Sequence, residues 1–372
     1  MSSSNLFFQN PLDAAVLKAR RFVKAGEHSD PRGNYFRDVT AIIHSYPFRR
    51  LKHKTQVFYA PKNDHICTRI EHVMHVASIA STICRALDLN SDLAWAIGLG
   101  HDLGHTPFGH LGEQILAELS GQPFSHELYS LKTVDSLTGY GKGLNLTYAV
   151  RDGIVNHCGE RFEQSLKPDF SVCCLENLTD RSRLPATWEG VVVRFSDKIA
   201  YLGRDFEDAC HLHLISAESL PPAAERVLGN NNAKMINTMV RDLIETSLKT
   251  GEIGFSDAVY EAVRHLVKFN YEHIYRNPKM TAYHDNFKRI LTAVYGYLTD
   301  LIQKYGRDTQ RFFDEPNSLA AHFADYLEKM SAYYEDKPES EAAFDYVAGM
   351  TDDYAIDCVS EIMLPKSFQI KF

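Results

Sequence analysis

Residues 100–110 read GHDLGHTPFGH and overlap the end of an apolar segment that runs over residues 93–103. The apolar run predicts a helix, and Gly104 is a residue type that often ends one. His101 and Asp102 are adjacent at this helix end, so both can face one ion, as a nitrogen ligand and an oxygen ligand. We therefore expect a helix that delivers a His–Asp pair to a metal.

Histidines are concentrated around this stretch. Seven of the 17 histidines lie within residues 65–126, a sixth of the chain, where an even spread would put about three. Such clustering indicates metal binding or proton transfer. Other histidines carry a different expectation, and His157 is predicted to be structural or solvated.

Two further helices bring polar side chains into the pattern. Apolar residues recur at helical spacing over 69–87 and again over 189–209. The first segment places a basic residue and a histidine three apart, on one side of the helix. In the second, Asp197, Tyr201 and Asp205 follow one another at steps of four and so share a face. Buried carboxylates and a phenol need partners, which a metal and a polar ligand would supply.

The rest of the chain is predicted to be helical as well, including an amphipathic, aromatic-rich stretch over residues 258–302. Two segments break the pattern: glycine-rich residues 138–145, predicted to connect helices, and residues 216–234, predicted to be a surface connection. We therefore predict an all-α fold with a catalytic region over 1–215 and a C-terminal helical region over 216–372, packed on the same globule.

Composition excludes several classes of protein. Hydrophobic residues make up 44% and charged residues 24% of the chain, as in a globular protein with a sizeable core. The net charge of −8 provides no global basic field for nucleic acid. No apolar run is long enough for a membrane helix, and no secretory signal is recognisable. Seven cysteines without a C-x-x-C pair predict free thiols in the cytoplasm.

Beyond these features, the chain resembles a known family, the deoxynucleoside triphosphate (dNTP) triphosphohydrolases of the HD-domain superfamily, which include bacterial dGTPase-like enzymes. The matching blocks run from about residue 48 to 352 and so span most of the chain. They are Phe48–Leu51, Lys54–Phe58, Thr68–His72, His101–His110, Phe124–Glu127, Asp197–Asp205 and Asp345–Asp352. The resemblance implies an HD-domain helical fold with additional C-terminal helices.

The resemblance also implies roles for individual residues. It implies one divalent transition metal (Mn, Fe, Co, Ni or Zn) that is bound by four ligands: His72, His101, Asp102 and Asp197. Mg²⁺ is a candidate companion of the substrate. It implies a catalytic histidine, His110, supported by Glu113, His126 and Glu127, with His105 as a further candidate. It implies contacts to the triphosphate from Arg69 and Lys198, and to the sugar from Gln56, Val57, Tyr201 and Asp205.

The implied reaction converts a dNTP and water into deoxynucleoside and inorganic triphosphate. Two alternatives stay open: an HD-domain 5′-nucleotidase or phosphodiesterase, and a non-catalytic nucleotide sensor or nucleic-acid-binding protein. Phosphodiesterases of this kind add His and Asp ligands for a second metal, yet the only other adjacent His–Asp pair is His284-Asp285, in a polar stretch. By resemblance we expect a homo-oligomer, with a nucleotide effector and single-stranded DNA as candidate partners and no membrane association.

Overall fold

The computed structural model describes residues 6–23, 30–59, 65–158, 162–179 and 182–364, and within these ranges it is almost entirely helical. The helices of the first half are α1 (Ala14–Leu17), α2 (Gly33–Ile43), α3 (Tyr46–Arg50), α4 (Arg69–Ala86), α5 (Ser91–Gly100), α6 (Gly109–Ser120), α7 (His126–Lys132), α8 (Tyr148–Val155) and α9 (Trp188–His211). Those of the second half are α10 (Pro222–Leu228), α11 (Asn232–Thr250), α12 (Asp257–Asn270), α13 (Pro278–Thr281), α14 (His284–Tyr305), α15 (Ser318–Lys329), α16 (Ser331–Tyr334), α17 (Glu339–Ala348) and α18 (Asp352–Met363). The prediction of an all-α fold is confirmed.

Strands are minimal in the described ranges. β1 (Ser165–Leu166) pairs antiparallel with β2 (Ile253–Gly254), and Ser165 lies opposite Gly254. None of the described helices is both long and apolar enough to cross a membrane. All seven cysteines are free thiols.

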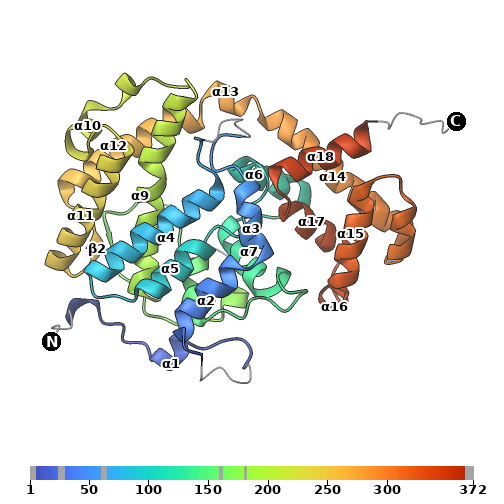
Figure 1. Ribbon diagram of the computed structural model, residues 1–372, viewed down its shortest axis with the longest axis horizontal. Coiled ribbons are helices and arrows are strands. Elements are labelled where there is room, and N and C mark those ends of the chain that lie inside the picture. The colour runs from blue at the N-terminus through green and yellow to red at the C-terminus, as the bar shows by residue number, and fades with distance from the viewer. Residues whose placement is uncertain (1–5, 24–29, 60–64, 159–161, 180–181, 365–372) are drawn as a thin grey trace.

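Helix α4 lies at the centre of the molecule and packs against α5 and α9 (Figure 1). Its start is stabilised by a carboxylate, because Glu71 accepts a hydrogen bond of 2.7 Å from the backbone N–H of Thr68. Helix α9 begins with a similar cap, since the Thr187 hydroxyl accepts from the N–H of Gly190 at 3.1 Å. These caps fix where the two helices that carry predicted metal ligands begin.

The two largest hydrophobic clusters of the described residues organise the helices. The larger contains buried residues from Phe8 to Leu266 and so joins residues on both sides of position 215. The other packs residues 108–129 against residues 287–358. Figure 1 shows α9–α12 on one side of α4 and α15–α18 on the other, with α13 and α14 leading from one group to the other. The division into a catalytic region over 1–215 and a C-terminal region over 216–372 stays a prediction. Apolar packing connects the two regions.

Three segments differ in detail from the sequence-based expectation. Helix α5 ends at Gly100, so residues 101–104 form a turn instead of a last helical turn. The predicted connection over 216–234 contains α10, which begins at Pro222 and buries Ala224 and Leu228. Proline at the first helical position suits a helix start, and the surrounding apolar contacts favour the helix over a loop. The stretch 258–302 is helical but divided among α12, a π-helical turn, α13 and α14.

Gly104 is needed for close packing more than for ending a helix. Its N–H donates to the Ser130 hydroxyl at 2.8 Å, and an added Cβ would overlap the backbone of Tyr129 and Ser130. The turn that carries His101 and Asp102 therefore lies directly against α7.

We predict that Gly104→Ala lowers the free energy of unfolding by about 1–3 kcal/mol, because backbone atoms of α7 must move. Urea denaturation followed by circular dichroism measures the change. Gly296→Ala is the matched control: this residue lies within α14 with open space around it, so alanine should raise stability by about 0.5–1 kcal/mol. Equal effects of the two variants would contradict the packing role of Gly104.

Candidate metal centre and active site

The four predicted metal ligands lie together at the meeting point of α4, α9 and the turn after α5. His72 Nε2 is 3.1 Å from Asp197 Oδ1 and 3.9 Å from Asp102 Oδ2. His101 Nε2 is 3.6 Å from Asp102 Oδ1 and 3.9 Å from Asp197 Oδ1. Three of the four residues are buried, and Asp197 is half-buried. Two imidazole nitrogens and two carboxylates thus converge on one small volume.

The orientation of His101 fits an ion. Its Nδ1 lies 2.8 Å from the carbonyl oxygen of Gly98, which makes Nδ1 the donor and leaves Nε2 with a free lone pair. Nε2 is buried and has no hydrogen-bond partner. An unsatisfied buried nitrogen is costly unless a ligand completes it. The mixed nitrogen and oxygen donors therefore fit a divalent metal.

Arg69 reaches this centre from the first turn of α4. Its guanidinium donates to Asp102 Oδ2, to the carbonyl oxygen of Thr55 at 3.0 Å and to that of Gln56 at 3.1 Å. Burial favours the neutral carboxyl group, but the neighbouring His101 imidazole and Arg69 guanidinium hold the pKa of Asp102 well below its usual range. Arg69 thus orients one metal ligand and the adjacent loop, and the triphosphate contact stays a prediction.

A second group of histidines surrounds one carboxylate. Glu113 Oε1 is 3.0 Å from His110 Nδ1, 3.2 Å from His126 Nδ1 and 3.3 Å from His105 Nδ1. The rings of His105 and His126 are stacked with centroids 4.4 Å apart. His110 differs from the others because 71% of its side chain is exposed. It is therefore the histidine of this group that an incoming molecule can reach.

His126 connects the two groups. Its Nε2 is 3.8 Å from Asp102 Oδ1, and its Nδ1 is 3.6 Å from Glu127 Oε2. Burial alone would lower the pKa of His126, but the carboxylates of Glu113 and Glu127 raise it to about 9. The raised pKa favours the protonated ring of His126, whose positive charge offsets the buried carboxylates around it.

His157 lies against this network, and of the two predicted alternatives, structural or solvated, its burial excludes the solvated one. It is buried, and its ring lies 4.8 Å from the His101 ring. Its Nδ1 contacts the carbonyl oxygen of Ile154 at 2.7 Å, as that of His101 contacts Gly98. One ligand atom each of Asp102, His126 and His157 lie within 4.8 Å of one another. One sequence signal could have indicated this position: His157 follows the apolar helix α8, as His101 follows α5.

On α9, the residues predicted to hold the sugar are near the metal ligands. Asp205 is buried and accepts a hydrogen bond of 2.6 Å from the Tyr275 hydroxyl. Burial raises the pKa of Asp205 to about 7, although Tyr275 acts in the opposite direction. The Tyr201 ring packs against the larger hydrophobic cluster. Tyr275, which carried no assigned sugar role from the sequence, therefore positions the Asp205 carboxyl group.

The remaining predicted substrate residues line the approach from the loop before α4. Val57 packs in a small hydrophobic cluster with Ile274 and Tyr275, so it lies on the same side as Asp205. The Oε1 atom of Gln56 is buried without a hydrogen-bond partner. Lys198 is half-buried, with its ammonium 5.9 Å from the Phe162 ring centroid. Gln56 therefore offers a second unsatisfied polar atom that a bound molecule could complete.

Comparison with known proteins agrees with this geometry. The family model of the HD domain matches residues 69–200, which contain all four predicted metal ligands. The model of the phosphohydrolase-associated domain matches residues 253–361. The two models together reach from α4 to α18.

Similar full-length proteins carry one common description. A deoxyguanosinetriphosphate triphosphohydrolase-like protein of Caldanaerobacter subterraneus subsp. tengcongensis is 39% identical over 96% of this chain and 92% of its own length. Proteins of the same description from Desulfatibacillum aliphaticivorans and Clostridium tetani are 37% and 34% identical over 90% and 93% of this chain, and over 88% and 90% of their own lengths. The chain therefore belongs to the deoxyguanosinetriphosphate triphosphohydrolase-like family of HD-domain hydrolases.

Proposed function

We propose that this protein hydrolyses deoxynucleoside triphosphates to deoxynucleoside and inorganic triphosphate, with one divalent metal held by His72, His101, Asp102 and Asp197. The observation that carries the proposal is the juxtaposition of two groups. In the proposed metal-ligand set, the Nε2 atom of His101 is buried and has no hydrogen-bond partner. In the neighbouring group, the exposed His110 contacts the Glu113 carboxylate through Nδ1. Related proteins named for dGTP support the same substrate class.

The chemistry requires a nucleophile, an acid and compensation of charge. A divalent metal, when bound, supplies Lewis acidity that lowers the pKa of a water ligand and polarises a phosphoryl oxygen. The reaction joins a water oxygen to the α-phosphorus and breaks the bond from that phosphorus to O5′. His110 protonates the departing O5′ through Nε2, because Glu113 holds Nδ1 at 3.0 Å. Lys198 offsets the charge of the triphosphate.

The sugar lies between α9 and the loop before α4 in this proposal. Gln56 and Asp205 bind the 3′-hydroxyl, and the unsatisfied Oε1 of Gln56 accepts a hydrogen bond from it. Asp205 is held by Tyr275 at 2.6 Å. Val57 and the Tyr201 ring close on C2′, which leaves no polar partner for a 2′-hydroxyl.

An HD-domain phosphodiesterase with two metals is the second candidate function. One ligand atom each of His105, His110, Glu113 and His126 lie within 4.8 Å of one another, so this group could hold a further ion. The two candidates differ in metal content and in product. Two metals per chain, with turnover of a phosphodiester and no release of triphosphate, would favour the phosphodiesterase.

We predict that His101→Ala loses most of the bound metal and nearly all turnover while the helical content is unchanged. Plasma mass spectrometry of the purified protein measures the metal, and circular dichroism reports the fold. His284→Ala is the matched control, because this histidine also precedes an aspartate. Its Nδ1 lies 3.4 Å from Asp285, whose side chain is exposed, so we expect metal content and turnover to be unchanged. Full activity of a metal-free His101→Ala protein would refute the proposed chemistry.

We predict that His110→Ala lowers kcat by about 10²–10⁴-fold with the metal still bound, as expected for loss of a general acid. Steady-state release of inorganic triphosphate from dGTP measures the effect. Glu113→Gln should reduce kcat in the same direction, because it weakens the orientation of the same ring. If His110→Ala retained the wild-type kcat, the acid would have to be reassigned, with His126 the next candidate.

We predict that the wild type prefers deoxyribonucleotides over ribonucleotides by at least roughly 5- to 150-fold in kcat/KM, because a buried hydroxyl without a partner costs about 1–3 kcal/mol. The measurement compares dGTP with GTP and dATP with ATP. Val57→Gly should narrow the preference by opening the wall at C2′. Equal rates on both sugars in the wild type would indicate a general nucleotide phosphohydrolase instead.

A further inference from the structure

A cavity of about 350 Å³ lies between the end of α3, the start of the π-helical turn at Thr133–Leu137, and helices α15, α17 and α18. This volume is within the range of about 300–1,000 Å³ that is usual for small-molecule sites. None of the residues proposed above for the metal, the acid or the sugar lines it. The cavity is therefore separate from the metal centre, although Leu103, which follows Asp102, forms part of its wall.

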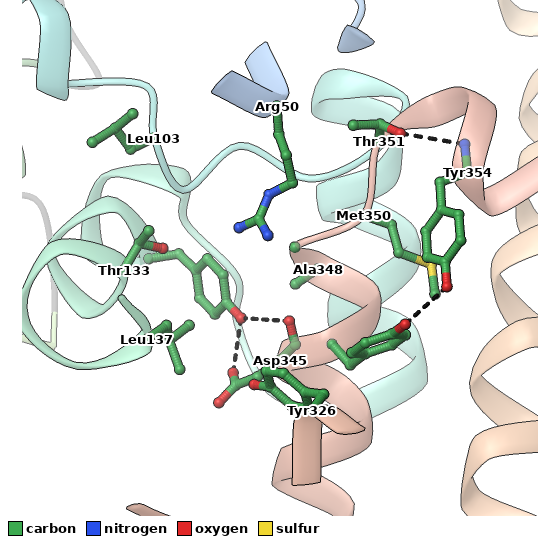
Figure 2. Close-up of a pocket in the computed structure, with 13 residues that line it drawn as sticks. Arg50, Leu103, Thr133, Leu137, Tyr326, Asp345, Ala348, Met350, Thr351 and Tyr354 are labelled. Atoms are coloured by element: carbon green, nitrogen blue, oxygen red, sulfur yellow. Dashed lines mark hydrogen bonds between the residues drawn. The ribbon is translucent and has the colours of Figure 1, made fainter. Parts of the chain in front are cut away.

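Arg50 provides the charge that faces this cavity. Figure 2 shows its guanidinium extending from α3 into the space between Thr133 and Ala348. Its Nε is buried without a hydrogen-bond partner, and within the described ranges its side chain makes no ion pair. The residue as a whole is half-buried, and a cation that is partly removed from water and has no ion-pair partner is stabilised by an anion. This feature points to an anionic ligand.

The one carboxylate in the cavity wall is already engaged. Asp345 accepts hydrogen bonds from Lys132 Nζ at 2.8 Å, from the Tyr129 hydroxyl at 2.8 Å and from the Tyr334 hydroxyl at 3.0 Å. Lys132, which also pairs with Glu341, offsets its charge, and the three donors take up three of its roughly four lone-pair positions. The charge of Arg50 is therefore not cancelled from within the cavity.

The rest of the wall is aromatic and apolar. The tyrosine hydroxyls are largely bonded to one another: Tyr346 is bonded to Tyr354 at 2.8 Å, a dashed line in Figure 2, and Tyr326 is bonded to Tyr334. The rings, together with Leu137 and Met350, thus present carbon surfaces to the cavity. Such walls favour a planar apolar body, which packs against aromatic rings with little polar surface left unsatisfied.

We infer that this cavity is a second ligand site, for a small molecule that places a phosphate or carboxylate group on Arg50 and a planar apolar body among the tyrosine rings. The guanidinium is planar and presents a fork of N–H donors, which matches two oxygens of either head group. The site goes beyond the proposed hydrolysis, and a binding experiment tests it without reference to turnover.

Location is tested by crystals of the full-length protein soaked separately with 4-bromophenylphosphonate and 4-bromobenzoate, neither of which is a phosphate ester. The anomalous signal of bromine should lie among the tyrosine rings, with the head group on Arg50. Comparison of the two probes shows whether Arg50 prefers phosphonate or carboxylate oxygens. Bromine found only at the metal centre or on the outer surface would overturn the inference.

Affinity is tested by calorimetric titration of the same probes into the wild type and Arg50→Gln. Loss of a charged hydrogen-bonded contact should weaken binding by roughly 10- to 150-fold. Arg49→Gln is the matched control: this neighbour on α3 is exposed, with its guanidinium 5.3 Å from the Tyr46 ring, and binding should be unchanged. Equal affinities of the two variants would overturn the assignment.

A second variant covers the case in which Arg50→Gln does not fold. Arg50→Lys retains the charge but loses the planar fork, so it should bind more weakly than the wild type and retain its circular dichroism spectrum. If Arg50→Lys bound both probes with the affinity of the wild type, the planar guanidinium of Arg50 would not be what recognises the head group.

Discussion

The buried ion pair between Arg69 and Asp102 is the interaction on which the candidate active site depends. Both side chains are almost inaccessible to solvent, at 2% and 4% exposure. The pair joins the start of α4 to the turn after α5, and the same guanidinium holds the backbone of Thr55 and Gln56. Removing either partner would leave an uncompensated buried charge, which is far more costly than losing a surface pair. One predicted metal ligand, Asp102, and the proposed sugar-binding loop are thus fixed by one cation.

The C-terminal part of the chain completes this arrangement from the other side. Asp352, at the first position of α18, accepts hydrogen bonds from the backbone N–H of Thr55 at 3.0 Å and of Phe108 at 2.9 Å. Phe108 has a left-handed backbone conformation, with φ of 65°, that a bulky residue rarely adopts. Its ring stacks on Phe287 of α14 at 4.3 Å. The segment before His110 is therefore held in a strained shape by α14 and α18.

Electrostatic balance explains why so many histidines occur together. The carboxylates of Asp102, Glu113 and Glu127 are buried within a short distance of one another and would repel without cations between them. His126 lies between the three and has a pKa raised to about 9. His110 remains at the solvent side of the same network. The protein thus separates a buried histidine that balances charge from an exposed one that can exchange a proton with a ligand.

The sequence by itself determined the helical fold class, and its resemblance to the family supplied the candidate residues of the site. Helical periodicity marks α4 and α9, because it depends on residue type and local spacing, whereas the candidate metal ligands His72, His101, Asp102 and Asp197 are what the family resemblance implies. The end of α5 and the helix α10 were not predictable, since packing against distant segments overrides local signals there. The roles of His157, Tyr275 and Arg50 were decided only by the tertiary structure, because burial and the neighbour across the fold determine what a histidine, a tyrosine or an arginine does.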